Sequence, residues 1–246
     1  MIFFKKKEKK ISNFFPENFI DIHSHLLPGI DDGAGDLDKS IKLLEQMAAM
    51  GISKLITTPH VMAEIYQNSS ATIKLKLQEV RKELERRNIN DISIDAAAEY
   101  MLDEQFLALL KNNDILPLKD KYILVEMSYI NPPIHLFEIL YEIKLKGYIP
   151  VLAHPERYHF YHTNFEGYAT LKHAGCLFQL NLLSLTNYYG KHIQKISKKI
   201  LDLKMYDFVG TDLHHINHLR HIQSMLTDTH KKELYFLLEN NAVVFN

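Results

Sequence analysis

Seven short apolar runs recur along the chain, and each leads to a polar residue of a type that can bind a metal ion. Between the runs lie segments in which apolar residues recur at the spacing of a helix. Short apolar runs that alternate with helices are typical of a parallel sheet covered on both faces, and seven in series favour closure into a (β/α) barrel. The residues at which the runs end are His23, His60, Glu99, Glu126, His154, Asn181 and Asp212.

Start and stop signals predict the helices between these runs. The first helix is expected from the N-cap Asp36 to Gly51, with apolar residues at helical spacing. Pro132-Pro133 is expected to open a helix that ends at Gly147. Further helices are expected over residues 70 to about 87, in the stretch before Gly175, and over about 190–203.

The length of 246 residues and the hydrophobic fraction of 46% suit one barrel-type domain. We expect a mobile, basic N-terminal extension over residues 1–18 and a folded domain over residues 19–246. The net charge of -1 argues against wholesale nucleic-acid binding. The lysines near the N-terminus precede any apolar stretch long enough for a signal peptide or a membrane span, so we expect a cytoplasmic protein without stable membrane insertion. The basic extension gives the inner face of the membrane as a further expected location.

Cys176 is the only cysteine, which excludes an intramolecular disulfide and a Cys-rich zinc site. Cysteine-dependent tyrosine phosphatases carry their nucleophile in a Cys-x5-Arg loop. No arginine stands at that place after Cys176. We therefore expect a buried, structural thiol.

The segment from Asp21 to His25 makes the strongest chemical prediction. Alternate side chains of a strand share a face, so Asp21 and His23 are expected to point the same way. His25 falls just past the strand end, where the chain can curl back so that both imidazoles reach one ion. Active sites of such barrels lie at the carboxyl ends of the strands. Imidazole and carboxylate ligands without thiolate suit Mn, Fe, Zn or Mg in a catalytic site.

Six segments near the run ends carry a more specific pattern. They read DIHSHLLPGIDDG (21–33), TPH (58–60), AEY (98–100), VEM (125–127), AHPERY (153–158) and GTDLH (210–214). From about residue 19 onward the chain resembles the polymerase and histidinol phosphatase (PHP) superfamily, and within it the CpsB-type metal-dependent tyrosine phosphatases of bacterial capsule and exopolysaccharide clusters. The resemblance implies a distorted (β/α)7 TIM-like barrel of the PHP type.

The resemblance also implies a ligand set for three divalent metal ions, with Mn²⁺ expected first and Fe, Zn and Mg as alternatives. One ion would take His23, His25, Glu99 and Asp212. A second would take Glu99, Glu126 and His154, with Glu99 bridging. A third would take Asp32, His60 and His214.

The mechanism implied is attack of a metal-bound hydroxide on the phosphorus of phosphotyrosine. Arg157 would clamp the phosphate, and Arg220 is a candidate second phosphate contact. Asp21 would orient a ligand histidine through its other ring nitrogen. The substrate implied is the tail of a tyrosine autokinase that regulates capsule or exopolysaccharide synthesis.

Two other functions stay open: a small-molecule phosphatase such as histidinol-phosphate phosphatase, and a non-catalytic PHP module that binds a partner. Arg157 has the simpler alternative of an ion pair with Glu156. Histidines outside the ligand set, among them His159, His162 and His192, are expected to be solvated. Five tyrosines next to the strand ends either line a mouth for an aromatic ring or pack the loops. They are Tyr66, Tyr129, Tyr158, Tyr188 and Tyr189.

Overall fold

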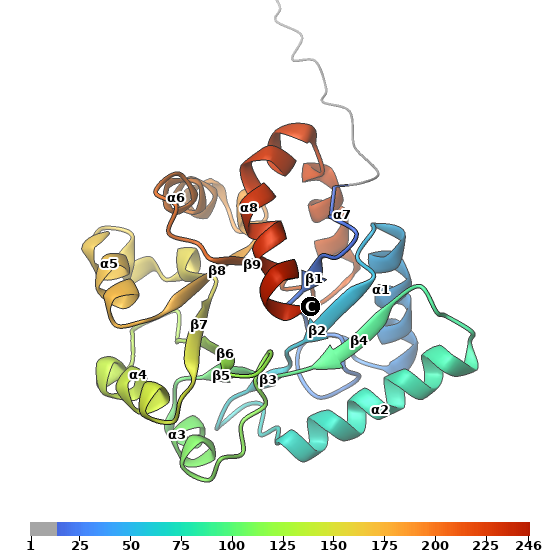
Figure 1. Ribbon diagram of the computed structural model, residues 1–246, viewed down its shortest axis with the longest axis horizontal. Helices are drawn as coiled ribbons and strands as arrows, with labels where there is room; N and C mark the ends of the chain where they lie inside the picture. The colour runs from blue at the N-terminus through green and yellow to red at the C-terminus, as the bar shows by residue number, and fades with distance from the viewer. Residues whose placement is uncertain (1–13) are drawn as a thin grey trace, which may run out of the picture.

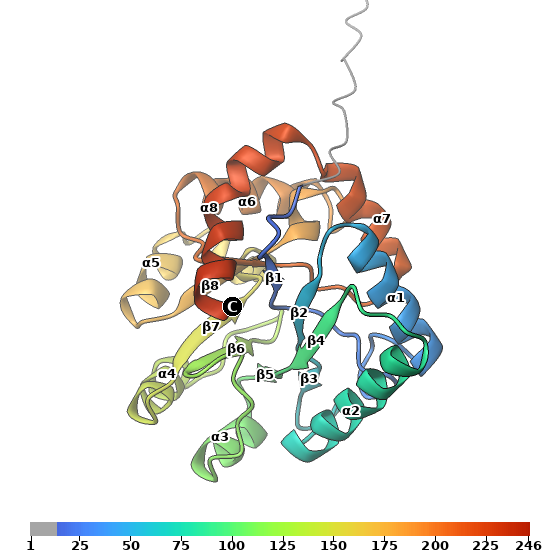
Figure 2. The same cartoon turned by 45° about the vertical axis from the view of Figure 1, so that its right-hand side comes forward.

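Parallel strands form the centre of the molecule and helices surround them (Figures 1 and 2). A computed structural model describes residues 14–246 of the chain. Within that range the named strands form two groups, in the orders β1-β2-β4 and β3-β5-β6-β7-β8-β9, and each pairing inside them is parallel. The strands are β1 (Ile20–Asp21), β2 (Lys54–Thr57), β3 (His60–Val61), β4 (Ser93–Ala96), β5 (Glu99–Met101), β6 (Tyr122–Glu126), β7 (Ile149–Ala153), β8 (Leu177–Asn181) and β9 (Phe208–Gly210).

Two of the predicted runs are each broken into two strands. The second run becomes β2 and β3, and the third becomes β4 and β5. Pro59 lies in the first break and has no N–H to donate to a ladder. Backbone hydrogen bonds continue across the gap, because Ala97 N donates to Thr57 O (2.9 Å) and Glu99 N donates to Pro59 O (3.1 Å). The two groups of strands are therefore one series that follows the order of the sequence.

The first and last strands of this series meet. Asp212 N donates to His23 O (2.7 Å) and His25 N donates to Leu213 O (2.8 Å), just beyond β9 and β1. At the other end of β1 and β9 the side chain of Asn241 lies between the strands and takes the place of direct backbone hydrogen bonds. Its amide nitrogen donates to Ile20 O (2.9 Å) and Val209 O (2.6 Å), and its oxygen accepts from Val209 N (3.1 Å). The predicted α/β architecture is confirmed.

Helices cover the outside of the strands. They are α1 (Leu37–Ala49), α2 (Ser70–Arg86), α3 (Glu104–Lys111), α4 (Leu136–Leu145), α5 (Glu166–His173), α6 (Lys191–Asp202), α7 (Ile216–Met225) and α8 (Asp228–Phe245), with short 3-10 turns η1 (Pro155–Arg157), η2 (His159–Tyr161) and η3 (Leu182–Leu185). Asp36 caps α1 as predicted, since its side chain accepts from Lys39 N (2.8 Å). Helices α3, α7 and α8 were not predicted from the sequence.

The packed part of the chain begins before the expected boundary at residue 19. Phe14 and Phe15 are buried in the core. The Phe15 ring lies 5.1 Å from that of Phe14 and 4.9 Å from that of Phe19, measured between centroids. The basic stretch over residues 5–10, which carries the prediction of a mobile extension, lies outside the described residues.

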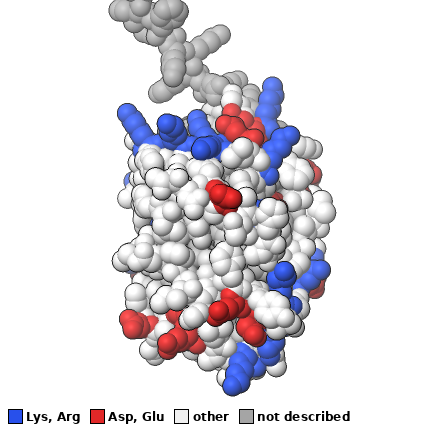
Figure 3. All heavy atoms as spheres, turned by 90° about the vertical axis from the view of Figure 1, so that its left-hand side faces the viewer, with Lys and Arg blue, Asp and Glu red and all other residues white. Residues whose placement is uncertain are grey.

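The face shown in Figure 3 carries Lys and Arg along its upper edge and again at its lower right and bottom, with Asp and Glu near both groups and a broad uncharged surface between them. This face has no continuous basic stripe of the kind that nucleic-acid binding uses. Within residues 14–246, no helix is both long enough and apolar enough to cross a membrane.

Candidate metal centre

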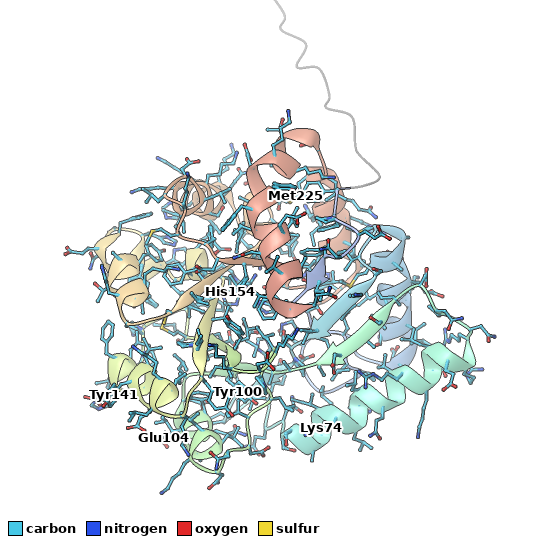
Figure 4. All side chains as sticks on the ribbon, viewed as in Figure 1. Lys74, Tyr100, Glu104, Tyr141, His154 and Met225 are labelled. Atoms are coloured by element: carbon cyan, nitrogen blue, oxygen red, sulfur yellow. The ribbon has the colours of Figure 1, made fainter. Side chains whose placement is uncertain are left out.

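The carboxyl ends of the strands open into a cavity of about 1080 Å³. Figure 4 shows His154 among the side chains at the centre of the molecule, whereas Tyr141 on α4 projects outward. The expected ligands that line the cavity are Asp32, His60, Glu126, His154, Asp212 and His214. His23, His25 and Glu99 lie beneath them and are fully buried.

Four of the expected ligands form the floor of the cavity. His23 Nε2 lies 3.3 Å from His25 Nε2, 3.3 Å from Glu99 Oε2 and 3.3 Å from Asp212 Oδ1. His25 Nε2 lies 3.4 Å from each of the same two carboxylate oxygens. Two imidazole nitrogens and two carboxylate oxygens thus converge within the distance that the ligands of one ion share.

Glu99 connects this floor to a second group. His60 Nδ1 lies 3.1 Å from Glu99 Oε2 and 2.8 Å from Glu126 Oε1. His154 Nε2 contacts the other oxygen of Glu99 at 3.1 Å. The resemblance placed His154 with Glu126, but the closest histidine to Glu126 here is His60, and His154 groups with His23 and Asp212.

Asp32 forms the outer group with two histidines. Its Oδ1 lies 3.4 Å from His214 Nε2 and 3.5 Å from His60 Nε2. Burial by itself would raise the pKa of Asp32, but the hydrogen bond and charge of His214 and the charge of His60 lower it to about 2. Asp32 is therefore ionised at any working pH.

Three of these histidines are held by their other ring nitrogen. His23 Nδ1 contacts Gln179 Oε1 (2.7 Å), His25 Nδ1 contacts Asp31 Oδ2 (2.9 Å) and His214 Nδ1 contacts Asp212 O (2.9 Å). Each partner is an acceptor, so Nδ1–H donates and the Nε2 lone pair faces the cluster. This is how metal-binding histidines are usually oriented. Sequence reasoning did not assign Asp31 or Gln179, although a glutamine within an apolar strand was a visible signal.

Four atoms of the cluster lack a hydrogen-bond partner in the described part of the chain. Glu99 Oε2, Glu126 Oε1, His60 Nδ1 and His154 Nδ1 are buried and make no hydrogen bond there, although short contacts bring the first three together. Buried carboxylates and imidazoles normally satisfy each other or bind a cation. The residues therefore fit a cluster of divalent ions with nitrogen and oxygen ligands.

The backbone at these positions is specialised. His154 (φ 35°) and Asp212 (φ 49°) adopt the left-handed conformation directly after β7 and near the end of β9. Such residues cost about 1–3 kcal/mol each and cluster at functional sites. Gly33 and Gly210 allow the backbone to lie close to the two histidines. A Cβ added at Gly33 would lie 2.0 Å from His25 O, and one added at Gly210 would lie 2.6 Å from His23 Cβ.

Arg157 lies at the wall of the cavity. Its guanidinium donates to Asp212 Oδ2 (3.0 Å) and sits over the rings of Tyr129 (4.6 Å) and Tyr189 (4.4 Å). The alternative of an ion pair with Glu156 is wrong. Glu156 is buried on the other side of η1, where it accepts from Asn181 N (3.1 Å) and Tyr206 Oη (3.0 Å).

Two expected roles are corrected by the contacts. Asp21 does not orient a ligand histidine: it accepts from Thr211 N (2.8 Å) and Thr211 Oγ1 (2.7 Å), while Gln179 occupies the free nitrogen of His23. Thr211 directly follows β9 and precedes Asp212, so Asp21 holds the segment that carries Asp212. Arg220 is exposed on α7, donates to Asn217 Oδ1 (2.9 Å) and does not line the cavity.

Cys176 and Tyr158 are buried, whereas the other four tyrosines line the cavity. Cys176 is buried, and burial raises the pKa of its thiol to about 12, as expected for a structural thiol. Tyr158 is fully buried and accepts a hydrogen bond from Met127 N (3.0 Å), so it packs the loops. The tyrosines that line the cavity are Tyr66, Tyr129, Tyr188 and Tyr189.

Comparison with known proteins gives a consistent result. A family model described as capsular polysaccharide synthesis, CpsB/CapC, matches residues 19–233. The tyrosine-protein phosphatase YwqE of Bacillus subtilis (strain 168) is 31% identical, over 91% of this chain and 89% of its own length. The putative tyrosine-protein phosphatase CapC of Staphylococcus aureus is 28% identical, over 88% of this chain and 85% of its own.

Solved structures agree with these relatives. A chain from the crystal structures of YwqE from Bacillus subtilis and CpsB from Streptococcus pneumoniae, described as metal-dependent tyrosine phosphatases, superposes with a TM-score of 0.81 at 29% identity. The match covers 92% of this chain and 94% of that one. The Lmo2620 lactonase of Listeria monocytogenes, at 12% identity and a TM-score of 0.54, shares the fold alone.

Proposed function

Because the chain belongs to the capsular polysaccharide synthesis CpsB/CapC family, we propose that it is a metal-dependent tyrosine-protein phosphatase. Relatives along nearly the whole chain are named as tyrosine phosphatases. The observation that carries the proposal is the set of imidazoles whose Nδ1 atoms are tied to Gln179, Asp31 and a carbonyl while Nε2 faces the carboxylates. This arrangement prepares ligands for divalent ions on the floor of one open cavity.

Three divalent ions are proposed for this cluster, with Mn²⁺ first and Fe, Zn and Mg as alternatives, because the ligands are nitrogen and oxygen atoms. The sets would be His23, His25, Glu99 and Asp212; Glu99 and Glu126 with His60 or His154; and Asp32, His60 and His214. Ions bound there supply positive charge for the phosphoryl oxygens and lower the pKa of a bound water.

Arg157 is proposed to bind the phosphate. Its planar guanidinium presents five N–H groups, of which Asp212 Oδ2 takes one, and two aromatic rings fix its plane. A held guanidinium matches two phosphate oxygens at once, and its charge stabilises the additional negative charge of the transition state. Asn181 supports this arrangement because its Nδ2 donates to the same Asp212 oxygen (2.6 Å).

The proposed substrate is a phosphotyrosine in a protein, namely the tail of a tyrosine autokinase that regulates capsule or exopolysaccharide synthesis, in the cytoplasm. The names of the relatives support a phosphotyrosine protein as substrate, and the family description supports a role in capsule synthesis. The exposed Ile65 and Ile130 at the mouth of the cavity offer apolar contacts to residues that flank the phosphotyrosine.

The test compares turnover of a phosphotyrosyl peptide and of histidinol phosphate by the Mn²⁺-loaded protein, with metal analysis of each sample. Preference for the peptide is expected. His23→Ala is expected to lose both bound metal and turnover, and Arg157→Lys to lower kcat/KM by roughly 10²-fold. Arg220→Ala is the matched control and is expected to retain wild-type turnover. Preference for histidinol phosphate, or full turnover by His23→Ala, would contradict the proposal.

A further inference from the structure

Three imidazoles meet on the surface, outside the cavity. His159 belongs to η2, His162 follows η2 directly, and His192 lies in the first turn of α6. His162 Nδ1 lies 2.9 Å from His192 Nε2, and one nitrogen of each ring lies within 4.8 Å of the others. The two segments are in contact because α6, at the upper left of Figure 1, packs against η1. None of the three residues lines the cavity.

His162 is already oriented as a ligand. Its Nε2 lies 2.8 Å from Glu156 O, and a carbonyl only accepts, so Nε2 carries the proton. The lone pair of Nδ1 therefore points toward His192. Burial and the neighbouring His159 and His192 lower the pKa of His162, which keeps the ring neutral and able to bind a cation. This is the same use of a backbone carbonyl that fixes His214 in the metal centre.

The other two rings can adjust to an ion. His159 and His192 are exposed, and their rings are nearly parallel, with an interplanar angle of 7° and centroids 6.2 Å apart. Bonds of about 2.0–2.1 Å to a tetrahedral ion place nitrogen ligands roughly 3.3 Å apart. The present separations, 2.9 Å for His162 and His192 and within 4.8 Å for the whole set, lie on both sides of that value, and the two exposed rings are free to rotate. Lys191 next to His192 is also exposed, so water and salt screen its opposing charge.

We propose that His159, His162 and His192 form a separate site for Zn²⁺ or a similar transition-metal ion. Three neutral imidazoles without a carboxylate favour Zn²⁺, Cu²⁺, Ni²⁺ or Co²⁺ over Mn²⁺ and Mg²⁺, which prefer oxygen ligands. The site joins the connection between β7 and α5 to the start of α6. The fourth coordination position faces solvent and takes water.

An ion at this site acts on the segment that carries Arg157. His162 holds the carbonyl of Glu156, and the carboxylate of Glu156 holds Asn181 N and Tyr206. Arg157 is the next residue. Binding ties His162 to α6 and so restrains η1 and η2, without any ligand in common with the central cluster.

The test is equilibrium dialysis of Mn²⁺-saturated protein against a low concentration of Zn²⁺, with both metals measured per chain. We expect the wild type to take up one additional Zn²⁺ without loss of Mn²⁺. His192→Ala, which removes an exposed ring, is expected to lose this uptake, and so is His159→Ala. His173→Ala on α5 removes an exposed histidine outside the cluster and is expected to behave as the wild type.

Hydrogen exchange supplies a second readout that does not depend on activity. Zn²⁺ is expected to slow amide exchange over residues 155–163 in the wild type and in His173→Ala, but not in His192→Ala. Equal Zn²⁺ uptake by all variants would overturn the proposal, and so would Zn²⁺ uptake that is matched by an equal loss of Mn²⁺. Uptake without any change of exchange in the segment would overturn the proposed effect on η1 and η2.

Discussion

Gln179 determines how His23 meets the metal centre. Its oxygen accepts from His23 Nδ1 and its amide nitrogen donates to Leu180 O (2.6 Å), so the amide cannot turn over without losing both bonds. The residue is fully buried in β8, and its side chain makes no hydrogen bond to another expected ligand, while its backbone carbonyl accepts from His154 N (2.9 Å). The side chain therefore acts on the site through the orientation and tautomer of one imidazole.

Gln179→Leu keeps the volume of this side chain and removes its oxygen. We expect metal affinity to fall by roughly 10–100-fold, because the partner of a metal-binding histidine contributes about that much. Titration of metal-free protein with Mn²⁺ measures the effect, and Gln194→Leu, a change on the outer helix α6, serves as the control. An unchanged affinity in Gln179→Leu would show that His23 needs no such partner.

Gly210→Ala tests how closely β9 must approach His23. The added Cβ would lie 2.6 Å from His23 Cβ and 2.9 Å from Gln179 Nε2, so the strand or the histidine must shift. We expect a loss of stability of about 1–3 kcal/mol, typical of overpacking, together with a loss of turnover. Gly35→Ala is the control, since only the flexible Lys39 Nζ lies near, at 3.5 Å. Denaturant unfolding and peptide turnover measure both.

At the residue level, the sequence pointed to the side chains that converge in the cavity but not to the residues that support them. His23 and Asp212 lie just beyond β1 and β9, and Glu99 follows the break after β4. Each stands where an apolar run stops, and that position can be found in the sequence. Gln179 and Asp31 act through contacts between segments far apart in the chain, which no local pattern contains. Asp21 shows the same limit, because the Thr211 donors that it binds lie 190 residues away in the chain.

At the level of elements, helix α8 substitutes for a missing stretch of sheet. Asn241 reaches between β1 and β9 and satisfies Ile20 O, Val209 O and Val209 N with one side chain. These strands are short, and their direct backbone contacts begin only beyond their carboxyl ends. The metal centre depends on this junction because His23 and Asp212 lie on either side of it.

Asn241→Leu is expected to destabilise the protein by about 3 kcal/mol or more, because each buried backbone group left without a partner costs about 1–3 kcal/mol. The neighbouring Asn240 makes one hydrogen bond, to Asp207 O (2.9 Å), and is partly exposed. Asn240→Leu is therefore the matched control, with a small expected effect. If denaturant unfolding gave equal values for the two variants, the junction would not be the cause.

Helix positions followed from the sequence where caps and periodicity agreed. Asp36 and Gly51 enclose α1 as expected. Pro132-Pro133 was expected to open α4, but α4 begins at Leu136. A residue before proline is driven out of the helical region, so Pro132 could not be helical, and Leu136 N instead donates to Pro133 O (3.2 Å) in a turn. Helix α8 was missed because its buried face contains the polar Asn241.

For the whole molecule, the metal centre couples metal binding to protonation. Burial and the nearby His25 lower the pKa of His60, but the charges of Glu126 and Glu99 outweigh them and raise it to about 10. Without metal, His60 is therefore protonated at pH 7. A ligand nitrogen must lose its proton before it can bind a metal.

Addition of Mn²⁺ to metal-free protein at pH 7 to 8 is expected to release protons, and the apparent affinity is expected to rise with pH up to about 10. The sign follows because the folded protein holds the proton more tightly than free histidine, and metal displaces it. A pH indicator in weakly buffered solution measures the release. His23→Ala, which lacks a ligand, is expected to release fewer protons on the same addition. If Mn²⁺ addition caused proton uptake, or no change in bound protons, the expected protonation of His60 would be wrong.

The meeting of β1 and β9 also sets the order of events during synthesis. His23 and His25 leave the ribosome early, whereas Asp212, whose backbone N–H pairs with His23 O, leaves near the end. A growing chain that has not reached residue 212 thus exposes the histidine pair His23 and His25 without the carboxylate of Asp212 that shares their proposed ion. Since domains fold as units, the metal site forms only after the whole domain has been synthesised. A chain truncated before residue 212 is therefore expected to bind no metal at this site and to have no activity.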